Sequence, residues 1–235
     1  LGIQYVGIRR ISGATPTYHE GVLICPTGAG ATVAVDLADR TLRWGNSYRR
    51  RADSSNVSRF RRTEQSTDEL LERWHSSLAI ASGNTVVVTP AATDVLFCYD
   101  LVDGKSRFSK PRQSAFYVAG MRDGRLLMVG PREVISYNVE TGRLNWKADR
   151  DLVNAGNQIV GRGVFSEDRY IVPTSGNELV SISLEDGAIK ERRTTRFPLG
   201  NLIAVDGEII SQSATRLAVA LGAETLGPRV ERMLK

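Results

Sequence analysis

The sequence predicts an all-β protein made of repeated sheets, each with four antiparallel strands. The first observation is a pattern that occurs four times: apolar residues alternate, a tight turn follows, and a second short strand begins. The four copies are Val33–Trp44, Val95–Phe108, Val134–Trp146 and Leu179–Glu191. Such alternation around a polar turn is typical of a β-hairpin. Since an isolated hairpin is marginally stable in water, four copies predict an array in which hairpins pack on one another.

The second observation is a polar turn and a β-rich run ahead of each hairpin. The turn positions are Gly21, Gly83, Gly124, Asp168 and Gly207, spaced by 62, 41, 44 and 39 residues. One unit is therefore four strands, named A to D here, in about 40 residues, which is the period of a β-propeller blade. A β-sandwich is the next candidate, but it predicts neither a fixed period nor an aromatic residue at a repeated position. A parallel α/β fold needs longer connections than this chain has.

The hairpins resemble the pyrroloquinoline-quinone-like repeat of quinoprotein-like propellers, whose pattern is A-x-D-x-x-x-G-x-x-x-W. Ala34, Asp36 and Trp44 match it in the first copy, with Arg40 at the Gly position. The second copy matches at Asp100 and Gly104 and has Phe108 at the Trp position. The third matches at Gly142 and Trp146 and has Asn138 at the Asp position. The fourth matches only at Gly187. In this family the Trp docks one blade on the next. The resemblance therefore implies a structural, blade-docking role for Trp44, Phe108 and Trp146.

We expect about five blades within residues 1–221, forming an incomplete ring. Leu1–Ile11 is interpreted as the last strand of a preceding blade; alternatively, Ile3–Ile11 closes a five-bladed ring. The first interval is longer because of an insertion over residues 49–77, whose end, Ser66–Leu78, has the capping box and apolar face of a helix. Residues 222–235 have the composition of a helical tail or the start of a following domain. The missing initiator Met suggests a segment of a longer chain.

Composition fits a soluble globular class, with 41% hydrophobic and 24% charged residues in 235. No apolar run approaches the ~18–20 residues of a membrane span. The first residues also lack a signal-peptide pattern. Cys25 and Cys98 lie in different predicted strands, so we expect two small buried side chains, with a disulfide between them as the alternative.

Catalytic, cofactor and metal sites are not predicted. His19 and His75 have no neighbour at metal-ligand spacing, and Gly28-Ala29-Gly30 lacks the third Gly of a dinucleotide motif. The resemblance implies that quinone-binding relatives use an adjacent-cysteine pair, a calcium ion and a catalytic Asp, and no position here matches them. Asp36 and Asp100 are interpreted as hairpin hydrogen-bonders. Part of a quinone-dependent dehydrogenase is the alternative function, and it would need residues outside this segment.

The connections from strand D to the next strand A are rich in basic residues. In a propeller they emerge on one face together with the B–C connections, and variable loops on a rigid scaffold commonly bind partners. The candidate partner-binding residues are Arg49, Arg50, Arg51, Arg59, Arg61, Arg62, Arg112, Arg192 and Arg193; Lys110, Lys147, Arg150 and Arg196 lie in the same connections.

This pattern predicts an electropositive loop face for an acidic protein or anionic polymer, and a solvated rim without a partner is the alternative. Nucleic acid is disfavoured because no aromatic residues are interleaved with the arginines. The resemblance is to the non-enzymatic outer-membrane assembly lipoprotein type. It implies a scaffold for protein interaction in the periplasm or cell envelope.

Overall fold

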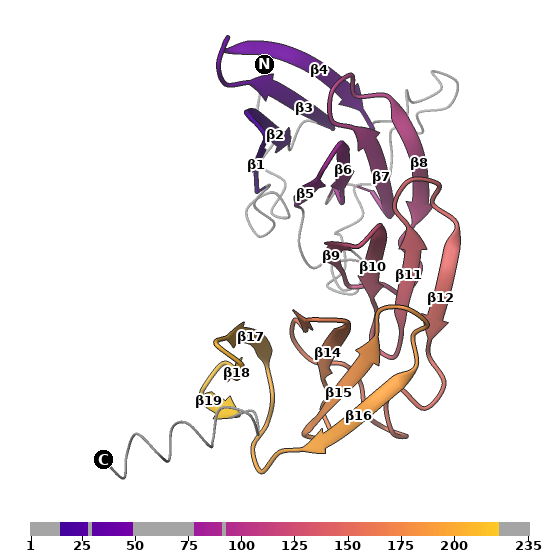
Figure 1. The fold of residues 1–235 in the computed structure, drawn as a ribbon, viewed down its shortest axis with the longest axis vertical. Coiled ribbons are helices and arrows are strands. Elements are labelled where there is room, and N and C mark those ends of the chain that lie inside the picture. The colour runs from indigo at the N-terminus through magenta and orange to yellow at the C-terminus, as the bar shows by residue number, and fades with distance from the viewer. Residues whose placement is uncertain (1–14, 28–29, 49–77, 91–92, 221–235) are drawn as a thin grey trace, which may run out of the picture. The chain divides into compact units, whose positions relative to one another are not determined.

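The computed structural model describes residues 15–27, 30–48, 78–90 and 93–220, and within them it contains only strands, turns and loops. Figure 1 shows the strands in successive small sheets. This confirms the prediction of an all-β fold built from antiparallel sheets. The predicted strand over residues 1–11, the helix in the insertion and the helical tail lie outside the described residues. No helix long and apolar enough to span a membrane occurs in the described part of the chain.

Sheet 1 and sheet 2 each have four strands in chain order, so A pairs with B, B with C and C with D. Sheet 1 consists of β1 (Thr17–His19), β2 (Val22–Pro26), β3 (Ala31–Asp36) and β4 (Thr41–Ser47). Sheet 2 consists of β5 (Ala79–Ser82), β6 (Thr85–Val88), β7 (Val95–Asp100) and β8 (Ser106–Pro111).

The remaining sheets repeat this order. Sheet 3 consists of β9 (Tyr117–Arg122), β10 (Arg125–Val129), β11 (Val134–Asn138) and β12 (Leu144–Ala148). Sheet 4 consists of β13 (Val164–Ser166), β14 (Arg169–Pro173), β15 (Glu178–Ser183) and β16 (Ile189–Thr194). Sheet 5 has three described strands, β17 (Asn201–Val205), β18 (Glu208–Gln212) and β19 (Leu217–Ala220).

The chain divides into two compact units. Unit 1 comprises residues 1–124 and 139–143, and unit 2 comprises residues 125–138 and 144–235. The core of unit 1 includes side chains from facing strands of sheets 1 and 2: Val22, Ile24, Ala34, Trp44, Ala79, Val86, Val88, Tyr99 and Leu101. Unit 2 contains a cluster between sheets 4 and 5, built on Ile171, Leu179, Leu199 and Leu202. In both units, alternating strand residues place apolar side chains between sheets, as the period-2 pattern predicts.

A bulge interrupts the pairing of strands C and D at the same place in four sheets. It lies next to the pairs Ala34–Trp44, Cys98–Phe108, Ser136–Trp146 and Ser181–Glu191. The bulge places one extra residue ahead of each strand-D position: Arg43, Arg107, Asn145 and Lys190. Since a bulge re-aims the side chains beside it, the repeated aromatic position has one geometry in every copy.

Candidate functional site

The first aromatic position, Trp44, lies on the C–D turn of the next sheet. Its side chain is buried, and the indole Nε1–H donates to the backbone carbonyl of Leu101 at 2.8 Å. The ring covers Gly104 closely, because a Cβ atom on Gly104 would lie 2.5 Å from Trp44 Cγ. Gly104 also has a φ of +70°, a backbone conformation that favours glycine. Trp44, Leu101 and Gly104 thus form a clasp between the outer strands of sheets 1 and 2.

Trp146 makes the same clasp within unit 2. Its Nε1–H donates to the carbonyl of Leu184 at 2.9 Å, and a Cβ on Gly187 would lie 2.6 Å from the ring. Gly187 has a φ of +75°. The geometry at Trp44 and Trp146 is what inter-blade docking requires, and the energetic weight of that docking stays a prediction.

Phe108 occupies the equivalent position on sheet 2 but forms an incomplete clasp. It is half-buried, and its ring covers Gly142, where a Cβ would lie 2.7 Å from Phe108 Cγ. Phenylalanine has no N–H to donate. The corresponding carbonyl, that of Val139, has the Cys98 thiol 3.9 Å away. Burial raises the pKa of Cys98 to about 12, although Arg107 opposes the shift, so this group is a neutral, weak donor.

Glu191 occupies the fourth position and supplies no aromatic ring there. It lies on β16, whose residues after Ile189 are exposed, and it pairs with Arg193 at 2.9 Å and Arg169 at 3.8 Å. Sheets 4 and 5 pack through the cluster of Ile171, Leu179, Leu199 and Leu202, against which Phe197 also packs. The backbone N–H of Leu202 also donates to the carbonyl of Arg162 at 2.8 Å. The described contacts between sheets 4 and 5 thus involve no aromatic residue at the repeated strand-D position.

The C–D turns and the basic connections lie at opposite ends of each sheet. In sheet 2, the first residue of β7, Val95, pairs with the last residue of β8, Pro111, so Arg112 lies near the start of β7. Gly104 lies beyond the other end of β7. In sheet 4, Glu178 pairs with Thr194 in the same way. We call the end of a sheet that carries the B–C and D–A connections the loop end. The opposite end, which carries the A–B and C–D turns, is the turn end.

Arg112 differs from the expectation of an exposed partner-binding residue. Only 8% of it is exposed, and Nη1 donates to the carbonyl of Ala115 at 2.8 Å. Its Nε lies 3.5 Å from the Asp94 carboxylate. The side chain of Arg112 is therefore held within its own connection by one hydrogen bond and one ion pair, although its buried Nε has no hydrogen-bond partner. Sequence alone does not show this, because the partners are a backbone carbonyl and a carboxylate from another loop.

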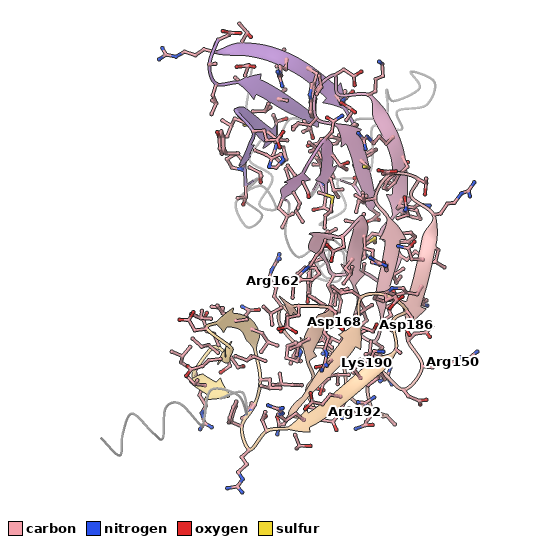
Figure 2. The ribbon with its side chains drawn as sticks, in the orientation of Figure 1. Arg150, Arg162, Asp168, Asp186, Lys190 and Arg192 are labelled. Atoms are coloured by element: carbon pink, nitrogen blue, oxygen red, sulfur yellow. The ribbon has the colours of Figure 1, made fainter. Side chains whose placement is uncertain are left out.

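Arg192 and Arg193 lie on β16, where Figure 2 labels Arg192 and Lys190. Arg192 lies 3.5 Å from Glu178, and Arg193 lies 2.9 Å from Glu191. In the same unit, Lys147 contacts Glu133 and Asp149. These cations are only partly buried. Their charge is locally compensated.

Arg49, Arg50, Arg51, Arg59, Arg61 and Arg62 lie outside the described residues. The structure describes the residues that flank their segment. Tyr48 donates from its hydroxyl to the carbonyl of Thr27 and stacks on Phe97 with ring centroids 6.1 Å apart. At the other side, Leu78 forms a parallel bridge with Thr15. Both flanks of the insertion are therefore held at the loop end of sheets 1 and 2.

Asp36 and Asp100 act within their hairpins, as the repeated position predicts. Asp100 Oδ1 accepts a bond from Val102 N at 2.9 Å, and Asp36 Oδ1 does the same for Ala38 N. Arg107 donates to Asp100 Oδ2 at 2.8 Å, and this bond, together with the backbone donors, lowers the pKa of Asp100 although burial opposes it. No group of three or more His, Cys, Asp or Glu that could hold a metal ion occurs among the described residues.

The comparisons with known proteins agree with this arrangement. The family model of the outer membrane protein assembly factor BamB matches residues 53–220, which is more than half of the chain. The chain belongs to this BamB family. Among solved structures, BamB from Moraxella catarrhalis is similar with a TM-score of 0.59 and 14% identity, over 89% of this chain and 60% of that one. The present chain thus spans about 60% of that BamB structure.

Two further solved structures share the fold of the BamB-family chain. The computationally designed Ika8 protein is 12% identical with a TM-score of 0.51, over 88% of this chain and 70% of that one. A chain of the Mitotic Checkpoint Complex is also 12% identical, with a TM-score of 0.55, over 88% and 61%. No curated protein matches the sequence. These similarities confirm the propeller fold predicted from the repeats.

Proposed function

We propose that this BamB-family chain is a non-catalytic propeller scaffold that binds a protein partner at the loop end of its sheets. The family is that of an outer membrane protein assembly factor, BamB, which supports a scaffold role in the cell envelope here. The sheets provide a rigid base, because the described strands pair with their neighbours and buried clusters pack sheet 1 on sheet 2 and sheet 4 on sheet 5. Rigid sheets that carry loops of variable length are a common basis for recognition.

The distribution of charge carries this proposal. The described residues hold equal numbers of basic (Lys, Arg) and acidic (Asp, Glu) side chains. The net charge of +5 therefore comes from residues 1–14, 49–77 and 221–235. Within residues 49–62 the sequence has six Arg against a single acid, Asp53. This segment is the strongest local concentration of positive charge, and its flanks are fixed at the loop end.

The partner that fits such a segment is an acidic protein surface. Opposite charges accelerate encounter and orient the two proteins, and salt weakens that attraction. Arg49, Arg50, Arg51, Arg59, Arg61 and Arg62 are the proposed primary contacts. Arg192 and Arg193 are proposed as secondary contacts, because each would exchange a carboxylate of its own chain for one of the partner.

A direct test uses poly-L-glutamate as the probe at two salt concentrations. We expect saturable binding to the 235-residue protein at low salt and a clear loss of affinity at high salt. Replacing the six arginines of residues 49–62 by Ser should abolish most of this binding while leaving the unfolding midpoint unchanged, since surface substitutions usually shift stability by less than ~0.5 kcal/mol.

The matched control removes charge at the turn end. Lys105 and Arg143 are exposed there, so Lys105→Ser/Arg143→Ser is compared with Arg50→Ser/Arg51→Ser. We expect the second pair to weaken binding several-fold and the first pair to leave it unchanged. Equal losses for both pairs would show attraction by net charge alone and would contradict a loop-end site.

A further inference from the structure

Four Asp-Gly pairs occur in the described part of the chain, and each lies in a tight turn at the turn end of its sheet. Asp103-Gly104 and Asp186-Gly187 are in C–D turns, whereas Asp123-Gly124 and Asp206-Gly207 are in A–B turns. An Asp followed by Gly is prone to isomerise without an enzyme, because glycine has no side chain to keep its backbone N from the aspartyl carboxyl. The surroundings of each pair decide which of the four reacts.

The reaction needs only water. The backbone N of the Gly attacks the side-chain carbonyl carbon of the protonated Asp; a C–N bond forms, the N–H proton is lost, and the carboxyl OH leaves as water. Water then opens the resulting succinimide ring at one of its two C–N bonds. Cleavage at the backbone carbonyl leaves the chain connected through the Asp side chain, which is isoaspartate. The water lost in the first step is regained in the second, so the net change is an isomerisation.

The pair Asp103-Gly104 is held in the first clasp. The N–H of Gly104 donates to the carbonyl of Asp100 at 3.0 Å, and the ring of Trp44 covers the buried Gly104. Asp103 accepts from the backbone N of Lys105 at 2.9 Å, and its carboxylate lies 2.6 Å from Lys105 Nζ. These contacts lower the pKa of Asp103, so less of the reactive protonated acid is present.

The pair Asp186-Gly187, whose Asp is labelled in Figure 2, is held in the same way. The N–H of Gly187 donates to the carbonyl of Ser183 at 3.0 Å, and the ring of Trp146 covers this glycine. Asp186 accepts from the backbone N of Ala188 at 3.0 Å. This bond, together with the Ser183 side chain, lowers the pKa of Asp186. In both C–D turns the attacking N and the carboxyl are therefore already engaged.

The pair Asp123-Gly124 has open surroundings. The φ angles of +49° and +70° are those of a type I′ hairpin turn, whose two central N–H groups take no part in the strand ladder. Within residues 93–220, which the structure describes without a gap, the N–H of Gly124 donates no hydrogen bond. A Cβ on Gly124 would meet nothing within 4 Å. The Asp123 side chain is 70% exposed, and Arg122 lies 3.8 Å from it.

The pair Asp206-Gly207 repeats this geometry in sheet 5. The φ angles are +49° and +77°, and the flanking Val205 and Glu208 pair with each other as the ends of the two strands. Both turn residues are exposed, and within the same described range the N–H of Gly207 donates no hydrogen bond. The two A–B pairs thus share every feature that the two C–D pairs lack.

We propose that Asp123 and Asp206 are sites of spontaneous isomerisation to isoaspartate, and that the aromatic clasps protect Asp103 and Asp186 from the same reaction. Isomerisation adds one backbone atom to a two-residue turn, so it alters the hairpin at the turn end. The proposal is independent of the acidic partner, because that partner is assigned to the loop end.

The test compares the four pairs within one protein. The unmodified 235-residue protein is incubated in mildly acidic oxygen-18 water, folded and, in parallel, unfolded in guanidinium chloride. Peptide mass spectrometry then measures isoaspartate and oxygen-18 uptake at each Asp, and the folded rate divided by the unfolded rate removes the effect of flanking sequence. We expect this ratio to be at least about tenfold lower at Asp103 and Asp186 than at Asp123 and Asp206, because reaction in a clasp requires local opening first. Equal ratios at all four, or an A–B pair as protected as a C–D pair, overturn the proposal.

A variant separates the clasp from the turn itself. Trp146→Ala uncovers Gly187 and leaves the Trp44 clasp in place, so the rate at Asp186 should rise about tenfold or more while the rate at Asp103 stays low. Circular dichroism checks that the variant is folded. A folded Trp146→Ala protein with an unchanged rate at Asp186 contradicts protection by the clasp. If the variant does not fold, the four ratios of the unmodified protein still decide.

Discussion

The thiol of Cys98 lies 3.9 Å from the backbone carbonyl of Val139, at the place where the two Trp clasps have an indole N–H 2.8 and 2.9 Å from the carbonyl. The carbonyl of Val139 thus has a weak donor, whereas the equivalent carbonyls of Leu101 and Leu184 each have a strong one. The difference follows from one residue, Phe108, since a phenyl ring fills the space over Gly142 but donates nothing.

Replacing Phe108 by Trp should complete the clasp and stabilise the protein. The half-buried ring leaves room toward solvent, and a new N–H bond to the carbonyl of Val139 contributes about 0.5–1.5 kcal/mol. Urea unfolding should show a higher midpoint with an unchanged slope. The reciprocal control, Trp146→Phe, should cost about 1–3 kcal/mol, because it leaves the carbonyl of Leu184 without its donor. A less stable Phe108→Trp protein would contradict the view that the carbonyl of Val139 has only a weak donor.

Truncation of Trp146 to Ala should be among the most destabilising single substitutions in unit 2. The side chain is buried and fills the space over Gly187, so its loss leaves a cavity, with an expected cost of about 3–5 kcal/mol. Phe108→Ala should cost less, because its ring is only half-buried and lacks the hydrogen bond. Thermal and urea unfolding measure both costs, and a loss of stability for Phe108→Ala as large as that for Trp146→Ala would contradict this order.

The repeats could be predicted from the sequence because their signals are local. Alternation, turn residues and the spacing of about 40 define the hairpins, and the strand-D aromatic is visible at one repeated position. The acceptors of the clasp could not be predicted this way. Leu101 and Leu184 accept these hydrogen bonds with their backbone carbonyls, which every residue type has, so the sequence does not reveal them.

The loop end was predicted less well, because charge in a sequence does not show pairing. Arg112 is basic and lies in a connection between blades, yet it is buried. Arg192 and Arg193 pair with Glu178 and Glu191, and the charge pattern of the sequence does not show which acid each arginine contacts.

Stability of unit 1 should depend on the ionisation of Asp100. The bond from Arg107 lowers the pKa of Asp100 in the folded state, so the contribution is present above the unfolded pKa of about 3.9 and is lost as pH falls through the lower folded value. Asp100→Asn should therefore be less stable at neutral pH, and the difference should shrink as the solution is acidified. In an Arg107→Gln background the same substitution should show a much weaker dependence on pH. Parallel unfolding curves at all pH values would contradict the role of this pair.

The contact of Trp44 with Gly104 can be isolated by comparing two glycines that share a backbone conformation. Gly104 and Gly124 both have a φ of +70°, but a Cβ on Gly124 meets nothing within 4 Å, whereas one on Gly104 would lie 2.5 Å from the Trp44 ring. Gly124→Ala should cost about 1–2 kcal/mol for the left-handed backbone alone. Gly104→Ala should cost that amount plus about 1–3 kcal/mol for displacing the indole.

The double variant Trp44→Ala/Gly104→Ala decides whether the extra cost comes from the ring. With the indole removed, the added methyl group has space, so Gly104→Ala should then cost no more than Gly124→Ala. The double-mutant cycle should give a coupling of about 1–3 kcal/mol between Trp44 and Gly104, while Trp44 and Gly124 should be additive within ~0.5 kcal/mol. Additivity in both cycles would mean that the contact between Trp44 and the C–D turn of sheet 2 does not contribute to stability.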